Sequence, residues 1–276
     1  MTYQEFWKKQ RETALSLNKE TSAVKILIAE LSGFGANDLY CHFDEEIPEE
    51  KEREILKALS RYFENGEPVQ YILGYSYFMG LKLKVSPAVL IPRPETELLV
   101  EIVLERLKDV LSPAVIDIGT GSGAIAIAIK DQLPDSQVIA VDISKIALAI
   151  AKENADDHRL SIQFLESDLF SSVTGTFDVL ISNPPYIGIE EEIDPLVRNN
   201  EPPGALFAPM EGLYFYEQIL KQSKIHLNPK FIIAMEIPEN KDEPLKELGK
   251  TFFPNAKMEI LKDYAHRSRI MIITNQ

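Results

Sequence analysis

Apolar residues recur at helical spacing over the first 70 positions of the chain. The i, i+3, i+4, i+7 pattern occurs twice, at Val24, Leu27, Ile28 and Leu31 and again at Ile55, Leu56, Leu59 and Phe63. The run Asn65-Gly66-Glu67-Pro68 then ends the second helix, because proline cannot continue a helix. The pattern predicts a small all-α domain over residues 1–72.

The next segment, 73–92, has a different pattern. Apolar Leu81, Leu83 and Val85 alternate with polar neighbours, which is the period of a β-strand. In Ile91-Pro92-Arg93-Pro94 each residue that precedes a proline is pushed out of the helical region. We therefore expect a β-hairpin and an extended linker here, followed by a helix from Glu95.

Beyond Pro113 the pattern alternates between strand, turn and helix, which is typical of a parallel sheet. Helices are expected from Ser122 and Ser144 and over 213–226 and 241–248. Seven strands are expected, at 114–118, 138–141, 162–165, 177–182, 231–237, 258–261 and 269–274. The predicted fold of residues 93–276 is an open, seven-stranded, Rossmann-like α/β sheet with an antiparallel ending.

Composition narrows the class of protein. Hydrophobic residues make up 45% and charged residues 26%, as in soluble globular proteins, and no run approaches the roughly 18 apolar residues of a membrane span. Cys41 is the only cysteine and the four histidines do not pair at ligand spacing, so we expect a cytoplasmic protein without a metal site. A net charge of -14 argues against binding to nucleic acid.

A glycine loop follows the first strand of the predicted sheet. In Gly119-Thr120-Gly121-Ser122-Gly123 the glycines let the backbone approach a ligand closely. Asp142 ends the next strand, at the sequence separation from the loop at which a carboxylate binds ribose hydroxyls in dinucleotide folds. Asp168 is placed to accept from an adenine amino group. The loop predicts a nucleoside cofactor, but with Ala124 it also fits a dinucleotide pattern, so the loop alone does not choose between them.

The tetrapeptide Asn183-Pro184-Pro185-Tyr186 follows the strand at 177–182, where ligands bind in open α/β sheets. The carboxamide oxygen of Asn183 and the carbonyl of Pro184 can accept both hydrogens of one NH2 group, and Tyr186 offers a flat face to a planar group. Pro184 and Pro185 fix the backbone. Together with the glycine loop, the motif predicts methyl transfer to a planar nitrogen, either a glutamine amide or an adenine amine.

The chain resembles the release factor glutamine methyltransferases of the HemK/PrmC family over nearly its whole length. Four segments carry the resemblance besides Asp117 to Gly123 and Asn183 to Ile187: Pro68-Val69-Gln70-Tyr71-Ile72-Leu73-Gly74, Leu90-Ile91-Pro92-Arg93-Pro94-Glu95-Thr96-Glu97, Glu201-Pro202 and Ala205-Leu206. Glu236-Ile237-Pro238 departs from the Glu-Ile-Gly that is frequent in the family.

The resemblance implies a substrate-recognition domain over 1–72, a hairpin linker and a class I methyltransferase domain. It implies transfer of a methyl group from S-adenosylmethionine to the glutamine amide in the Gly-Gly-Gln motif of class I release factors. It places Gly119, Thr120, Gly121, Ser122, Gly123, Asp142 and Asn183 at the cofactor, Asp168 and Leu169 near its adenine, and Asn183, Pro184, Pro185 and Tyr186 at the glutamine.

Other functions stay open at this point. The same core serves glutamine methylation of a ribosomal protein. Adenine methylation uses related chemistry on a flipped base, but the net charge counts against it. The intact glycine loop and the intact tetrapeptide Asn183-Pro184-Pro185-Tyr186 disfavour a binding protein without enzymatic turnover. NAD-dependent oxidation does not need the tetrapeptide.

Overall fold

The computed structural model describes residues 1–35 and 38–275 and divides into two compact units. The helical unit comprises Met1–Tyr75 and Asp194–Asn200, and the α/β unit comprises Ser76–Ile193 and Glu201–Gln276. The separate linker expected over 73–92 stays a prediction. None of the helices in the described ranges is both long and apolar enough to cross a membrane.

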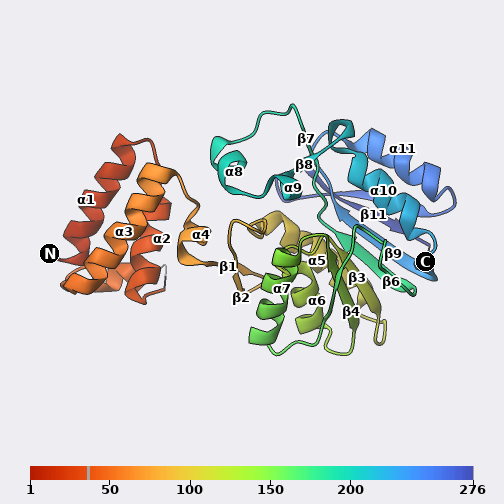
Figure 1. Ribbon diagram of the computed structural model, residues 1–276, viewed down its shortest axis with the longest axis horizontal. Helices are drawn as coiled ribbons and strands as arrows, with labels where there is room; N and C mark the ends of the chain where they lie inside the picture. The colour runs from red at the N-terminus through yellow and green to blue at the C-terminus, as the bar shows by residue number, and fades with distance from the viewer. Residues whose placement is uncertain (36–37, 276) are drawn as a thin grey trace. The chain divides into compact units, whose positions relative to one another are not determined.

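The helical unit has the predicted all-α character (Figure 1). Its elements are α1 (Tyr3–Ser16), α2 (Thr21–Ser32), the 3-10 helix η1 (Asp38–His42), α3 (Glu49–Asn65), α4 (Val69–Leu73) and α8 (Pro195–Asn200). Gly66 ends α3 in the left-handed region, as the sequence suggested. Eight apolar residues were expected on the inner faces of these helices, and the prediction is wrong for Leu56. Leu56 is 42% exposed, because it lies beside the buried stripe that Ile55 and Leu59 form.

Seven strands form one sheet in the α/β unit, in the order β10-β11-β9-β6-β3-β4-β5. They are β3 (Ala114–Ile118), β4 (Gln137–Asp142), β5 (Gln163–Glu166), β6 (Phe177–Ser182), β9 (Leu227–Glu236), β10 (Lys257–Lys262) and β11 (Ser268–Thr274). β11 pairs antiparallel with β9 and β10, and the other pairs are parallel. The predicted sheet and its antiparallel ending are confirmed.

Helices cover both faces of this sheet (Figure 1). One apolar core joins it to α5 (Pro94–Leu107) and α6 (Ala124–Gln132), with α7 (Lys145–Asp157) beside them, and a second core joins the other face to α10 (Tyr214–Ser223) and α11 (Asp242–Phe252). Ile116 and Val115, consecutive in β3, lie in different cores, as the alternation of a strand requires. A sheet buried on both faces is the doubly wound architecture.

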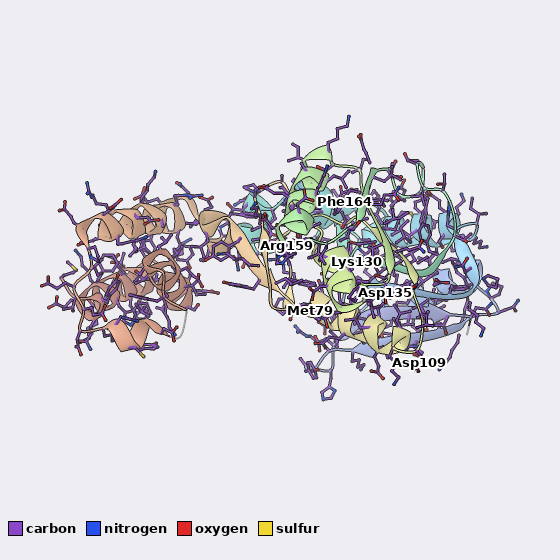
Figure 2. All side chains as sticks on the ribbon, turned by 90° about the horizontal axis from the view of Figure 1, so that it is seen from below. Met79, Asp109, Lys130, Asp135, Arg159 and Phe164 are labelled. Carbon is purple, nitrogen blue, oxygen red and sulfur yellow. The ribbon has the colours of Figure 1, made fainter. Side chains whose placement is uncertain are left out.

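The predicted hairpin consists of β1 (Tyr75–Phe78) and β2 (Leu81–Lys84). Met79, labelled in Figure 2, and Gly80 both have positive φ in the turn, which matches the twist of paired strands. Phe78 and Leu83 are buried in the first core of the α/β unit. The amide of Lys84 donates to Asn154 Oδ1 of α7 at 2.7 Å, so this part of the hairpin is fixed to the α/β unit.

Strand register sets the position of the site. Ile118, the last residue of β3, is the partner of Ser182, the last residue of β6, and the Ser182 hydroxyl donates to the Ile118 carbonyl at 2.7 Å. The chain runs outward from β3 through β4 and β5 and returns on the other side at β6, so the strand order reverses between β3 and β6. In open α/β sheets such a reversal typically places the ligand crevice at the carboxyl ends of the two strands.

Candidate active site

The glycine loop leaves β3 at this crevice and holds its shape through backbone hydrogen bonds. The amides of Gly119 and Thr120 both donate to the Val141 carbonyl at 2.9 Å. A Cβ added at Gly123, where φ is +83°, would lie 3.2 Å from the Ala151 backbone, so this glycine allows the loop to pack on α7. At Gly119 and Gly121 an added Cβ would meet no described atom within 4 Å, so these two glycines border open space.

Asp117 lies in β3, two residues before the loop, and is fully buried. Its Oδ2 accepts from the Thr120 hydroxyl at 2.6 Å, whereas its Oδ1 has no hydrogen-bond partner among residues 1–35 and 38–275. Burial raises the pKa of this carboxyl to about 7, although the Thr120 hydroxyl and the backbone amide of Ala126 lower it. A buried carboxylate with a free oxygen beside a ligand loop suits a positively charged ligand.

Asp142, at the end of β4, contacts the glycine loop. One carboxylate oxygen accepts from the Gly121 amide at 2.9 Å, and the other accepts from the Ser144 amide at 2.8 Å. The carboxylate therefore supports the loop and precedes α7, whose N-cap is Ser144. Each oxygen keeps a second lone pair for a ribose hydroxyl.

Asp168 and Leu169 follow β5, the next strand of the sheet. Asp168 is exposed, and Leu169 has a φ of 49° in a turn where its carbonyl accepts from the Ser167 hydroxyl at 2.8 Å. Both residues lie at the same edge of the sheet as the loops after β3 and β4, because these strands are parallel. Ile143, after β4, is 67% exposed at this edge.

The tetrapeptide Asn183-Pro184-Pro185-Tyr186, called the acceptor motif below, leaves β6 beside the glycine loop. Asn183 Nδ2 donates to the Thr96 hydroxyl of α5 at 3.1 Å. The Tyr186 hydroxyl donates to Glu236 Oε1 at 3.4 Å, and burial raises the pKa of that phenol, so it remains a donor. Pro184 is buried and Pro185 is partly buried. The first and last residues of the tetrapeptide are thus both held by side chains from other elements.

Gly212 packs directly against the acceptor motif. It ends the 3-10 helix η2 (Met210–Gly212) with a φ of +90°, and a Cβ on it would lie 2.0 Å from the Tyr186 carbonyl oxygen. Met210 and Glu211 also have positive φ, which is strained for residues with a Cβ. This turn follows β8 (Phe207–Ala208), which pairs with β7 (Ile187–Gly188) just after Tyr186. The turn therefore supports the acceptor motif at close contact.

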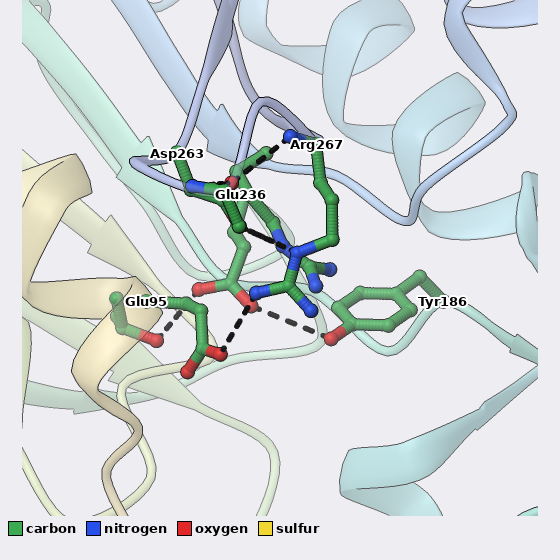
Figure 3. Close-up of polar contacts among 8 residues, drawn as sticks. Glu95, Tyr186, Glu236, Asp263 and Arg267 are labelled. Carbon is green, nitrogen blue, oxygen red and sulfur yellow. Dashed lines mark hydrogen bonds and ion pairs between the residues drawn. The ribbon is translucent and has the colours of Figure 1, made fainter.

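Glu236 joins the two ends of the acceptor motif. It is 2% exposed, and its Oε2 accepts from the Thr96 hydroxyl at 2.6 Å. Burial raises the pKa of Glu236, while the Thr96 hydrogen bond and the charge of Arg269 lower it. Figure 3 shows Glu236 facing Tyr186, with Glu95 and the Asp263–Arg267 pair around them.

A third buried carboxylate, Glu201, joins two segments on which the family resemblance rests. Glu201 accepts from the Ile91 amide at 3.2 Å and forms an ion pair with Arg93, which directly precedes α5. The Glu201 side chain is 1% exposed, so the pair fixes the chain at the start of the helix that carries Thr96.

The sequence prediction therefore identified the two loops but missed several residues around them. Thr96 and Glu201 were noted only as parts of motifs, and Glu236 only as part of a departure from the family pattern. Polar residues at strand ends or helix starts were a usable signal for Thr96 and Glu236. No signal marked Gly212, because its importance comes from one close backbone contact.

Comparison with known proteins identifies the relatives of this chain. Residues 10–74 match the PrmC N-terminal domain, and residues 95–198 match the methyltransferase small domain. A release factor glutamine methyltransferase of Streptococcus pneumoniae is 36% identical over 95% of this chain and 94% of its own length. The enzyme of the same name from Rhodopirellula baltica is 39% identical over 97% and 92%.

Among solved structures, a methyltransferase from Pyrococcus furiosus matches 82% of this chain and 98% of its own with a TM-score of 0.54. At 19% identity it supports the fold alone. The curated relatives are closer and span nearly the whole chain. The chain therefore belongs to the release factor glutamine methyltransferase family.

Proposed function

We propose that this enzyme transfers a methyl group from S-adenosylmethionine to the side-chain amide nitrogen of the glutamine in the Gly-Gly-Gln motif of class I release factors. One observation carries the proposal. The glycine loop and Asn183-Pro184-Pro185-Tyr186 leave adjacent strands at register partners Ile118 and Ser182, so a donor and an acceptor bound to them would meet in one crevice.

The residues around the glycine loop fit S-adenosylmethionine. Gly119 and Gly121 border open space, and Asp142 has lone pairs left for ribose hydroxyls. Asp117 supplies the negative charge that suits the ammonium group, with Thr120, Ser122 and Gly123 completing the loop. Asp168, Leu169 and Ile143 lie at the sheet edge for the adenine. When bound, this cofactor supplies a methyl group activated by a positively charged sulfur.

The acceptor motif orients the weakly nucleophilic amide. Asn183 Oδ1 and the Pro184 carbonyl accept its two hydrogens, and Tyr186 packs on its plane. The two acceptors favour the positive charge that develops on nitrogen as the carbon-nitrogen bond forms and the carbon-sulfur bond breaks. The amide nitrogen would gain the methyl group and lose one proton to water, and the cofactor would leave as its neutral thioether. No strong base and no metal ion are needed.

The choice of partner rests on the relatives, which are named for release factors. The net charge of -14 disfavours adenine in nucleic acid as the acceptor. A glutamine in a ribosomal protein uses the same amide chemistry and is the second candidate. We place the reaction in the cytoplasm, where release factors act.

The test is a methylation assay with labelled S-adenosylmethionine. The full chain is incubated separately with a class I release factor, the same factor with the motif glutamine changed to alanine, ribosomal proteins and DNA. We expect label on the unchanged release factor only. Label that persists on the alanine variant, or that appears on DNA alone, would refute the proposal.

Cofactor binding should depend on pH through Asp117. In the free protein this carboxyl has a pKa of about 7, so it is largely protonated below that pH and must ionise to meet an ammonium group. Affinity for S-adenosylhomocysteine should therefore rise with pH by up to about tenfold per unit below 7 and level off above it. Isothermal titration between about pH 5.5 and 7.5 measures the slope.

Asp117→Asn is the control for this titration, and it should bind weakly with little slope. Stability of the free protein should change in the opposite direction. Because the folded pKa lies above the ordinary aspartate value of 3.8, the contribution of Asp117 to stability is fully present below pH 3.8 and is lost as pH rises through about 7. A wild-type affinity that is flat across the range would contradict this role.

A further inference from the structure

The acceptor motif works only if the Asn183 carboxamide has one of its two orientations. In one orientation its oxygen can accept from a substrate NH2 group. In the other orientation its own NH2 group would face the substrate NH2 group, and two donors form no hydrogen bond. The two orientations have nearly the same shape, so packing alone does not choose between them. Some neighbouring group must distinguish oxygen from nitrogen.

Thr96 and Glu236 together make this distinction. A threonine hydroxyl has one hydrogen, and here the acceptor for it is Glu236 Oε2 at 2.6 Å. With that hydrogen committed, Thr96 Oγ1 can only accept at its contact with Asn183, which lies 3.1 Å away. The Nδ2 end of Asn183 must therefore face Thr96, and Oδ1 is left for the substrate.

We propose that Thr96 and Glu236 are positioning residues that orient the Asn183 carboxamide. They do so through a chain of two hydrogen bonds, in which Asn183 donates to Thr96 and Thr96 donates to Glu236. The inference rests on the proposed function and adds two residues that act through Asn183. It also gives a physical reason for a threonine in the first turn of α5 and for a buried glutamate at the end of β9.

Glu236 is built into the fold in a way that suits this role. It is the last residue of β9, and its predecessor Met235 is the register partner of Ser182, so Glu236 and Asn183 leave adjacent strands at the same level. The Tyr216 hydroxyl donates to the Glu236 backbone carbonyl at 2.7 Å. The carboxylate is thus held by a rigid strand and a buried hydrogen bond.

The charges around Glu236 act in both directions. Arg269 favours its ionised form and Glu95 disfavours it, while an Arg267 nitrogen lies 3.9 Å from a Glu95 oxygen and offsets that charge (Figure 3). Asp263 accepts from both arginines, at 2.9 Å from Arg267 and 3.3 Å from Arg269. Burial raises the pKa of Glu236, and the Arg269 charge opposes that shift, which favours the carboxylate as the acceptor of the Thr96 hydrogen.

The test uses the isosteric change Thr96→Val, which removes the hydroxyl and keeps the branched shape. We expect kcat to fall about tenfold with KM for both substrates unchanged, because the misoriented amide fails mainly in the transition state. Thr96→Ser restores the hydroxyl and should recover most of the rate. A Thr96→Val enzyme with wild-type kcat would overturn the proposal.

A double-mutant cycle separates positioning from general damage. In the Asn183→Ala background Thr96→Val should cause no further loss, since no carboxamide remains to orient. An equal loss in both backgrounds would mean that Thr96 acts on the fold and would also overturn the proposal. Thermal unfolding and S-adenosylhomocysteine affinity check that each variant is folded.

If Thr96→Val does not fold, Glu236 supplies the same comparison. Glu236→Gln keeps one acceptor oxygen, which the Thr96 and Tyr186 hydroxyls must share, and should retain more activity than Glu236→Leu, which keeps none. Equal activity of the two variants would overturn the proposal. If the wild-type enzyme methylates another glutamine protein instead of a release factor, the proposed function fails, and the cycle is measured on that acceptor.

Discussion

Asn183→Ala should lower kcat on the order of 100-fold, which is the loss typical of removing one preorganised hydrogen bond to the transition state. The change deletes the oxygen that accepts from the substrate amide and leaves the Pro184 carbonyl as the only acceptor. Affinity for the release factor should change little, because docking involves much more surface than one amide. Single-turnover methylation with saturating cofactor measures the chemical step directly.

Asn275→Ala is the matched control for this change. Asn275 is exposed and donates to the Pro229 carbonyl at 3.1 Å, far along the chain from the acceptor motif. Its loss should leave the single-turnover rate within about twofold of wild type. A single-turnover rate that is unchanged in Asn183→Ala would refute the acceptor role of that residue.

Gly212→Ala should also reduce kcat on the order of 100-fold, since a misplacement of about 1 Å at the reacting groups has an effect of that size. The new Cβ would lie 2.0 Å from the Tyr186 carbonyl oxygen, so either the acceptor motif or the turn must move. The φ of +90° adds strain for any residue with a side chain. Cofactor affinity should be preserved, because the three atoms nearest to a Cβ on Gly212 all belong to Tyr186.

Gly204→Ala provides the control for a glycine change. Gly204 lies in the short helix α9 (Pro203–Leu206), and a Cβ there meets no described atom within 4 Å. We expect this variant to keep wild-type kcat and KM. Full activity of Gly212→Ala in the same assay would show that the turn does not support Tyr186.

Much of the α/β unit could be predicted because its central strands β3 and β6 are largely buried and have glycine or proline close to both ends. The run from Val115 to Ile118 is apolar apart from Asp117, and the glycine loop that follows it can only be a turn. Parallel strands bring their carboxyl ends to one edge of the sheet, so both loops were expected at the same edge. The positions of Gly119 and Asn183 follow from this topology alone.

The residues that support the loops could not be predicted in the same way. Thr96 and Glu236 are 140 positions apart, and only the folded sheet brings them to hydrogen-bond distance. The strands β7 and β8 have two residues each, too few to give a periodic signal. Asp142 was expected at a ribose, but its contacts with Gly121 and Ser144 depend on turn geometry that composition does not encode.

The contact between Ile118 and Ser182 has a consequence for how the enzyme folds. These partners are 64 residues apart, so the chain must close a long loop before they can pair. Such nonlocal pairing is slow compared with the local contacts that form helices such as α1, α2 and α3. During synthesis the helical segments can therefore gain structure well before the glycine loop and the acceptor motif lie side by side, and we expect activity to appear only after the sheet has closed.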